Sequence, residues 1–334
     1  MQDFKDRIIE ITKQLKVDKE KTLLLLSEAD QERFLSSILR WLTNIIFQYI
    51  EGRYGEQRSI EQRRPYHSKE HTRKVMEIVG KMLEHATPKE RFLAQFAALF
   101  HDTVEEFKDS KMGIRIPEET NESDSNELFV VIANYLNRQC SKYSLPLLFS
   151  DEDFKRVALM IKTTKIAWNF QEGGPDQPAL IECQRLEDCA LAFADLGMVG
   201  IDPDEFFTNG QLLYREQNIN IELRIQQHLI DHKPFSIDEI TDFSYRFQCW
   251  CKAQIRFVDY SKMRHYERDI QRLTEQDRSI VAKFFSTENF KLSREKYEEL
   301  SARCKPSNFY ELLKDFGYDP ELVDQIAQPL PIPF

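Results

Sequence analysis

The spacing of apolar residues is the feature that most restricts the fold of this chain. Apolar side chains recur every three or four positions in almost every segment, as in the series Phe34, Ile38, Leu42, Ile45 and Ile46. That spacing gathers them on one face of an α-helix, whereas a half-buried strand alternates at every second residue. The 334 residues include only 10 glycines and 13 prolines, so few positions interrupt a helix. The pattern predicts an all-α protein.

Charge and composition argue against several classes of protein. The formal net charge is −10, whereas a general nucleic-acid-binding protein needs a basic face to neutralise phosphates. The apolar runs are much shorter than the roughly 20 residues of a membrane-spanning helix, and the charged start lacks the apolar centre of a signal peptide. None of the six cysteines forms a CxxC pair, which favours buried, reduced thiols over structural zinc. We therefore expect a cytoplasmic protein without membrane or general nucleic-acid binding.

Polar and proline-containing stretches divide the chain into three predicted regions. These are an N-terminal helical region over residues 1–62, a central region over 63–234 and a C-terminal helical extension over 235–334. In the central region, one largely buried helix is predicted from Lys89 to Glu106. The two flanking regions carry no motif of recognisable chemistry.

Histidine and aspartate occur where the surrounding sequence is otherwise helical and apolar. His67 and His71 are four positions apart, so on a helix both imidazoles project from one face, as in half of a transition-metal site. The same spacing also occurs by chance on exposed helices. His101 and Asp102 follow the apolar run AQFAALF, where a carboxylate needs a cation or hydrogen-bond donors. A divalent metal would supply the charge, and hydrogen bonds to nearby backbone are the alternative.

A third acidic position lies in another apolar segment. Asp195 stands within CALAFADLGMVG, where it too requires a partner. Asp188 competes with it, but its neighbours in RLEDCA are polar, so water can solvate it. The residues by themselves leave open whether these positions meet at one ion.

Five segments occur in an order that resembles one family. The arrangement H…HD…D, formed by His71, His101-Asp102 and Asp195, resembles the HD superfamily of metal-dependent phosphohydrolases. RPYHSKEH looks like the R-x-Y-H-x-x-x-H opening of a bacterial group of predicted HD phosphohydrolases, and like the YHN-x-x-H opening of cyclic-nucleotide phosphodiesterases. NESDS, MIKTTK and ADLGMVG are similar to the bacterial group's N-E-x-x-S, I-x-x-T and D-L-x-x-L-G segments. The resemblance covers about Arg64 to Gln217 and implies an HD-domain helical bundle with helical extensions on both sides.

The resemblance also implies roles for particular residues. His71, His101, Asp102 and Asp195 correspond to the ligands of one divalent metal ion, for which Mn, Mg, Fe, Co and Zn are all compatible. His67 corresponds to the phosphodiesterase histidine that protonates the leaving oxygen. An imidazole with a pKa near neutrality can act as such an acid.

Other residues near the motifs are expected to assist the reaction or to shape the site. HDTVEE resembles the HD-x-x-E-D phrase of alarmone hydrolases, whose acidic pair helps to orient the attacking water. Glu105 lies four residues after His101 and would face the same way on a helix, so we expect it to steer water or anchor a ligand. Glu106 is expected at a solvated helix end. Arg64 is the candidate for binding the substrate phosphate, and the alternative is that Arg64 is an exposed cation at a helix start. Asn121 is expected to shape the pocket or cap the next helix.

The chain departs from the bacterial group at two places. Ala167 stands where that group tends to have a histidine, and Arg215-Glu216 is similar to its R-x-E segment but displaced by one position. The remaining histidines are expected at the surface, so a single strongly held metal ion is predicted; they are His85, His228, His232 and His265.

The sequence therefore predicts a metal-dependent phosphohydrolase that cleaves a phosphate ester of a nucleotide-like small molecule with metal-activated water. A non-catalytic HD protein that binds a nucleotide as a regulator is the alternative, because the long flanking regions could serve partners. An HD-type di-iron oxygenase is a third candidate, which the missing histidines oppose. Helical additions often build homodimers, so a homodimer is a further expectation.

Overall fold

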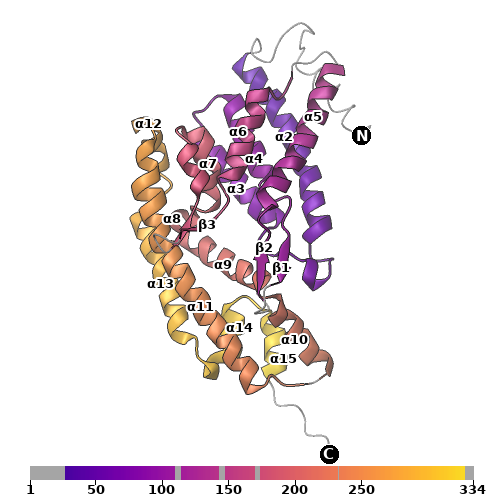
Figure 1. Cartoon of the computed structure of the whole chain (residues 1–334), viewed down its shortest axis with the longest axis vertical. Coiled ribbons are helices and arrows are strands. Elements are labelled where there is room, and N and C mark those ends of the chain that lie inside the picture. Colours follow the sequence, from indigo (N-terminus) through magenta and orange to yellow (C-terminus); the bar gives the residue numbers. More distant parts are fainter. Residues whose placement is uncertain (1–26, 110–113, 143–146, 170–173, 232, 328–334) are drawn as a thin grey trace, which may run out of the picture.

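The computed structural model describes residues 27–109, 114–142, 147–169, 174–231 and 233–327 and confirms the all-α class (Figure 1). Three parts of the sequence analysis lie outside the described residues: the first 26 residues of the N-terminal region, His232 and the tail over 328–334. Within the described residues, no helix combines the length and the apolar character needed to cross a membrane. All six cysteines are free thiols, and Cys249 is the exposed one.

The elements follow one another in a nearly uninterrupted series of helices. The α-helices are α2 (Glu28–Tyr54), α3 (Lys69–Met82), α4 (Pro88–Phe100), α5 (Asn121–Lys142), α6 (Asp151–Lys162), α7 (Leu186–Asp195), α8 (Met198–Ile201), α9 (Pro203–Gln217), α10 (Ile219–Asp231), α11 (Ile237–Ser261), α12 (Glu275–Val281), α13 (Thr287–Arg303), α14 (Phe309–Asp315) and α15 (Pro320–Ala327). Short 3-10 or π segments are η2 (Ile60–Gln62), η3 (Pro178–Glu182), η4 (Lys262–Asp269), η5 (Ile270–Arg272) and η6 (Pro306–Asn308).

Two short hairpins interrupt the helices and were not predicted. Strand β1 (Phe107–Asp109) pairs antiparallel with β2 (Arg115–Pro117), and β3 (Ala167–Asn169) pairs in the same way with β4 (Gly174–Asp176). Each strand has three residues, which is too short for a period-two pattern to be recognised in the sequence.

The helix starts are fixed by side chains that cap free backbone N–H groups. Thr87 and Glu90 form a reciprocal capping box at the start of α4, where Pro88 occupies the first turn. Ser150 caps α6, and Ser236 caps α11. Such local signals explain why α4 begins at Pro88, within one residue of the predicted start at Lys89.

Helix α4 is the centre of the half of the molecule that holds the predicted motifs. It packs against α2, α3, α6 and α7, and its side chains from Phe96 to Phe100 are completely buried. The prediction that this helix is enclosed on most sides is therefore confirmed. The ends of α3, α4 and α7 are brought together by this packing.

Helix α4 is shorter than predicted, because it ends at Phe100 and not at Glu106. The backbone N–H and the hydroxyl of Thr103 both donate to the Phe100 carbonyl, which closes a tight turn. Glu105 consequently lies in a loop, and the helical i+4 argument for its direction was wrong. Ile45 is a second difference, since 40% of it is exposed on α2.

The C-terminal region forms a long side of the molecule. Helices α11 and α13 run beside each other and pack together, while α10, α14 and α15 gather at one end (Figure 1). Helix α9 packs against α13, and buried apolar side chains from α2 to α15 form one continuous core. The division into regions 1–62, 63–234 and 235–334 stays a prediction.

Candidate metal centre

Four predicted residues meet where three helices end. His71 lies in the first turn of α3, His101 follows the last residue of α4, Asp102 comes next, and Asp195 is the last residue of α7. Each offers one nitrogen or oxygen atom, and these four atoms all lie within 4.8 Å of one another. We call these four residues the His/Asp cluster. Residues separated by more than 120 positions are thus positioned to hold one metal ion.

The distances within the His/Asp cluster agree with ligands of a single ion. Nε2 of His71 lies 3.3 Å from Oδ2 of Asp102 and 3.2 Å from Oδ1 of Asp195. Nε2 of His101 lies 2.9 Å from the same Asp102 oxygen and 3.8 Å from the same Asp195 oxygen. Two ligand atoms about 2.1 Å from one ion stand about 3.0 Å apart at a right angle and about 4.2 Å apart on opposite sides.

The orientation of His101 strengthens this interpretation. Its Nδ1 lies 2.8 Å from the Ala98 carbonyl, which can only accept, so Nδ1 carries the proton and donates. Its Nε2 therefore faces the carboxylates. The Nε2 atoms of both His101 and His71 are buried without a hydrogen bond of acceptable geometry. A metal ion would use both atoms, and a backbone carbonyl behind a histidine is a common way to orient a ligand.

The four side chains also act on one another's charge. Although burial opposes the charged form of each, the two carboxylates hold the pKa of His101 well above its usual range and raise that of His71. The imidazoles in turn lower the pKa values of Asp102 and Asp195. The carboxylates thus face positive charge, either from protons on the imidazoles or from a metal ion that displaces those protons.

His67 lies beside the cluster, but it is not on a helix as predicted. Ser68 caps α3, so His67 precedes the helix and the i, i+4 argument does not apply to it. Its ring centroid is nevertheless 6.4 Å from that of His71. The imidazole is held by Glu216, whose Oε1 lies 2.6 Å from Nδ1 of His67.

Glu216 is the functional residue that the sequence analysis undervalued. It is completely buried on α9, and its Oε2 also accepts from the backbone N–H groups of Tyr66 and His67. The displaced R-x-E similarity was a signal, but it was given little weight because the spacing did not match. A carboxylate in this position fixes both the ring direction and the charge of His67.

The charge of His67 differs from the prediction. Burial works against a protonated imidazole, but Glu105 and Glu216 outweigh it and raise the pKa of His67 to about 10. The expected pKa near neutrality was therefore wrong. The side chain is a held imidazolium whose Nε2 lies 3.4 Å from Oε1 of Glu105.

Glu105 reaches the site from a loop. Its backbone N–H donates to the Tyr54 hydroxyl, and its Oε2 accepts from Nδ2 of Asn121 at 2.5 Å. Burial raises the pKa of this carboxyl. Asn121 is the first residue of α5 and also bonds both backbone groups of Glu106. Asn121 therefore fixes the loop that carries Glu105.

Arg64 is buried, so the alternative of an exposed cation was wrong. Its Nε donates to the Glu105 carbonyl, and its Nη1 donates to the carbonyls of Glu61 and Arg63. The guanidinium also lies over the Phe107 ring, 4.7 Å from the centroid. These contacts give Arg64 a positioning role beneath the Glu105 loop and leave its predicted phosphate contact without support.

Other predicted positions have ordinary structural partners. Asp188 is paired with Arg156 and Arg185. Glu106 pairs with Arg53. His228 is buried and stacks on Phe235, contrary to the surface position expected for it.

A second group of potential ligands adjoins the His/Asp cluster. One atom each from His67, Asp102 and Glu105 also lies within 4.8 Å of the others. Here, however, the imidazolium of His67 already faces Glu105 and is bonded by Glu216. The His/Asp cluster is therefore the better candidate of the two for holding an ion.

Comparison of the chain with family models, curated proteins and solved structures gives no match. The likeness to HD phosphohydrolases accordingly rests on the motifs and on a buried His/Asp cluster that is compatible with them.

Proposed function

We propose that this chain is a metal-dependent phosphohydrolase of the HD type that cleaves a phosphate ester of a nucleotide-like small molecule. The observation that carries the proposal is the His/Asp cluster, in which two buried Nε2 atoms face the carboxylates without a hydrogen bond of acceptable geometry. Two imidazoles and two carboxylates leave further coordination positions on a divalent ion for water and a phosphate oxygen. Mn, Mg, Fe, Co and Zn all remain compatible with these ligands.

A divalent ion held there would lower the pKa of a bound water molecule and polarise the phosphorus of the ester. The residues of the chain would supply the proton transfers. Nδ1 of His67 is committed to Glu216, so His67 would donate from Nε2 to the leaving oxygen. Glu105, held by Asn121, would orient the attacking water. Glu216 and Asn121 would act as positioning residues.

The proposal is tested with the full chain stripped of metal and reloaded separately with each of the five ions. The substrates are p-nitrophenyl phosphate, bis-p-nitrophenyl phosphate, nucleoside monophosphates and cyclic nucleotides. Turnover that needs the ion and is lost in His101→Ala supports the proposal, with His85→Ala, an exposed histidine, as the matched control. Bound metal without turnover of any substrate contradicts it, and tight nucleotide binding in that case supports the regulatory alternative.

The leaving group gives a sharper test of His67. His67→Ala should slow the cleavage of nucleotide esters by about 10²–10⁴-fold, because their alkoxide leaving groups need a proton. The same variant should affect p-nitrophenyl esters far less, since p-nitrophenolate leaves unprotonated. Equal losses on both kinds of ester would contradict the acid role.

An oxygenase with two irons is the remaining candidate, because the second ligand group would be its second metal site if His67 gave up its contacts with Glu105 and Glu216. Metal analysis of the iron-loaded protein separates the two functions. One ion per chain agrees with the phosphohydrolase, whereas two irons per chain together with oxygen consumption would favour the oxygenase.

A further inference from the structure

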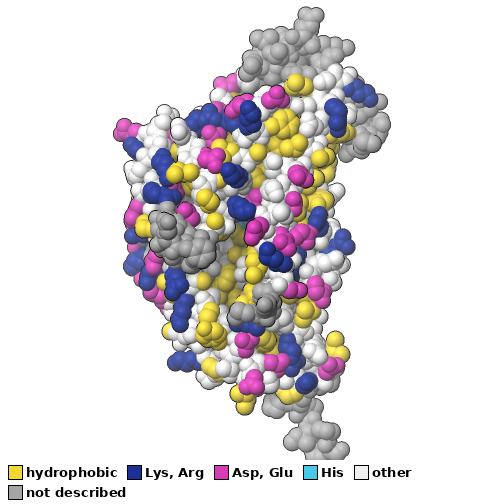
Figure 2. Space-filling view, in the orientation of Figure 1, with side chains coloured by type: hydrophobic (Ala, Val, Ile, Leu, Met, Phe, Trp, Pro, Cys, Tyr) yellow, Lys and Arg dark blue, Asp and Glu magenta, His cyan; other side chains and the backbone are white. Residues whose placement is uncertain are grey.

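A cavity of about 490 Å³ opens directly beside the His/Asp cluster. Asp195 of the cluster and Tyr66 line it, and the Tyr66 ring centroid lies 4.5 Å from that of His71. The volume is within the range of about 300–1,000 Å³ that is usual for small-molecule sites. Figure 2 shows apolar side chains gathered along the middle of this face, over α9 and beside α11.

The opposite wall of the cavity belongs to the C-terminal region. Trp250, Ala253, Gln254 and Phe257 line it, and these positions repeat at three or four residues along α11. One face of this helix is therefore turned toward the cavity. Because α11 lies outside the segment that carries the motifs, the site combines residues from two predicted regions of the chain.

The lining is mainly apolar and almost uncharged. Phe206 and Leu213 of α9 add to the apolar wall, and the polar lining includes three carboxamides, those of Asn209, Gln217 and Gln254. Asp195 and the exposed Arg256 are the charged members among the described lining residues. A row of phosphates would need several cations, whereas an apolar or flat aromatic group fits this lining.

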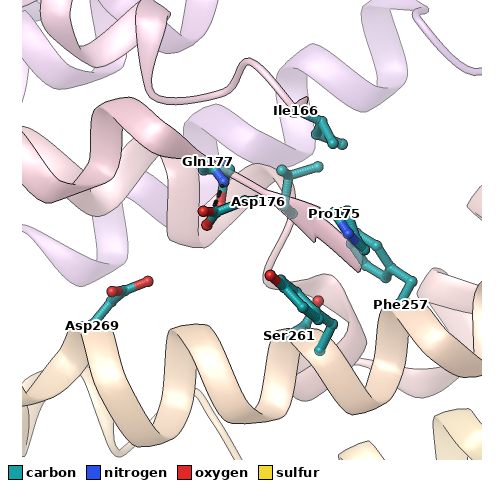
Figure 3. A pocket seen from close by; sticks show the side chains of 9 residues that line it. Ile166, Pro175, Asp176, Gln177, Phe257, Ser261 and Asp269 are labelled. Atoms are coloured by element: carbon teal, nitrogen blue, oxygen red, sulfur yellow. Dashed lines mark hydrogen bonds between the residues drawn. The ribbon is translucent and has the colours of Figure 1, made fainter. Parts of the chain in front are cut away.

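A second, much smaller hollow shares part of the lining of the cavity, at strand β4 (Gly174–Asp176). Pro175 and Phe257 also border a small hollow of about 10 Å³ against the end of α11 (Figure 3). That space holds about one water molecule. Asp269 on its far side is paired with Arg268 and Arg272.

We propose that this cavity binds the uncharged, apolar or aromatic part of a singly phosphorylated substrate, and that α11 selects that part. The inference rests on the proposed function for the position of the phosphate, at the His/Asp cluster. Tyr66, Trp250 and Phe257 would contact the organic group, while the carboxamides would meet its polar edge. The C-terminal extension is then a wall of the substrate site.

The test uses ligands that cannot be hydrolysed, so that it does not depend on turnover. Phenylphosphonate and methylphosphonate are titrated calorimetrically into the full chain loaded with Mn²⁺. Burial of the phenyl ring should make phenylphosphonate bind at least about tenfold more tightly. Equal affinities would overturn the inference.

Ala253→Trp tests the location, since Ala253 is exposed and a larger side chain there obstructs the cavity without disturbing the core. In this variant, phenylphosphonate and methylphosphonate should bind with nearly equal affinity. It should persist in Lys252→Trp, whose position is exposed but does not line the cavity. A preference that survives in Ala253→Trp would place the ring elsewhere and overturn the inference.

Turnover of 1-naphthyl phosphate, measured on the same samples, separates the two proposals. Phenyl-selective binding without any turnover would leave the cavity assignment standing and contradict the hydrolase. Turnover without phenyl-selective binding would support the hydrolase and contradict the cavity assignment.

Discussion

The His/Asp cluster and an aromatic core between α9 and the C-terminal region are both largely buried but differ in chemistry. We define that aromatic core by Tyr214, Phe247 and Phe316, whose rings contact one another with Phe247 and Phe316 only 4.2 Å apart between centroids. All three side chains are at most 1% exposed. Burial there raises the pKa of Tyr214 and keeps it neutral. In the His/Asp cluster, by contrast, burial encloses groups that carry charge.

This difference shows which buried groups need an explanation beyond packing. Aromatic side chains are stabilised in a core by the apolar area that they bury and by their edge contacts. Carboxylates are destabilised by burial unless a cation compensates them. Packing is therefore enough to explain why the three rings are buried, whereas the buried carboxylates of the His/Asp cluster require a proton or a metal ion.

Phe247→Ala should have the largest effect on stability, because it removes a completely buried ring from the aromatic core. We expect a loss of about 3–5 kcal/mol in the free energy of unfolding, measured by urea denaturation. Metal content should not change. Phe247→Leu, which leaves a smaller cavity, should show the same pattern with a smaller loss. A change in metal content in either folded variant would mean that the two regions are coupled.

His101→Ala should show the reverse pattern, because its main effect should be on metal binding and not on the free energy of unfolding. The loss should exceed the about 10–100-fold that substitution of an outer partner costs. Metal content after dialysis measures it, and the midpoint of thermal unfolding gives a second readout. Added Mn²⁺ should raise that midpoint in the unmodified chain and in His85→Ala, but not in His101→Ala. A normal metal content in His101→Ala would contradict the assignment of the cluster.

Glu216→Gln should change the protonation of His67 without changing metal binding. Removing this carboxylate takes away one of the three carboxylates that raise the pKa of His67 against the effect of burial, so that pKa should fall. Histidine resonances followed by NMR against pH measure the change without reference to activity. Turnover should decrease by about 10–100-fold while metal content stays constant. An unchanged pKa of His67 would refute the positioning role of Glu216.

A partly exposed ion pair that belongs to neither region should have the smallest effect. The pKa of Glu239 is lowered to about 2. The hydrogen bond that Arg224 donates to it is the largest cause, and it outweighs burial, which acts in the opposite direction. A carboxyl with a lowered folded-state pKa contributes stability above its ordinary value of 4.5, and this contribution is lost as the pH falls toward 2. Since 32% of the Glu239 side chain is exposed, we expect less than about 1 kcal/mol.

Urea denaturation of Glu239→Gln checks this expectation. The variant should be less stable than the unmodified chain at pH 7, and the difference should shrink when both are measured at pH 3. A difference that grows at low pH would contradict the assigned sign.

The sequence by itself determined the helices and the main members of the site. Apolar spacing and capping residues such as Ser150 act over a few positions, so the helix class and most helix starts could be predicted locally. Asp102 and Asp195 stood out because an acidic group in an apolar segment needs a partner, and the H…HD…D resemblance added His71 and His101 as ligands. The end of α4 was missed, since the turn at Thr103 depends on one competing hydrogen bond.

Only the tertiary structure decided how distant segments complete the site. Glu216 is 149 positions from His67, and nothing in the local sequence says that α9 brings the two together. The same holds for α11, which belongs to a region without any recognisable motif and which only the fold places opposite Asp195. Contacts of this kind depend on how whole helices pack, and packing is determined by the complete set of buried side chains and not by any one segment.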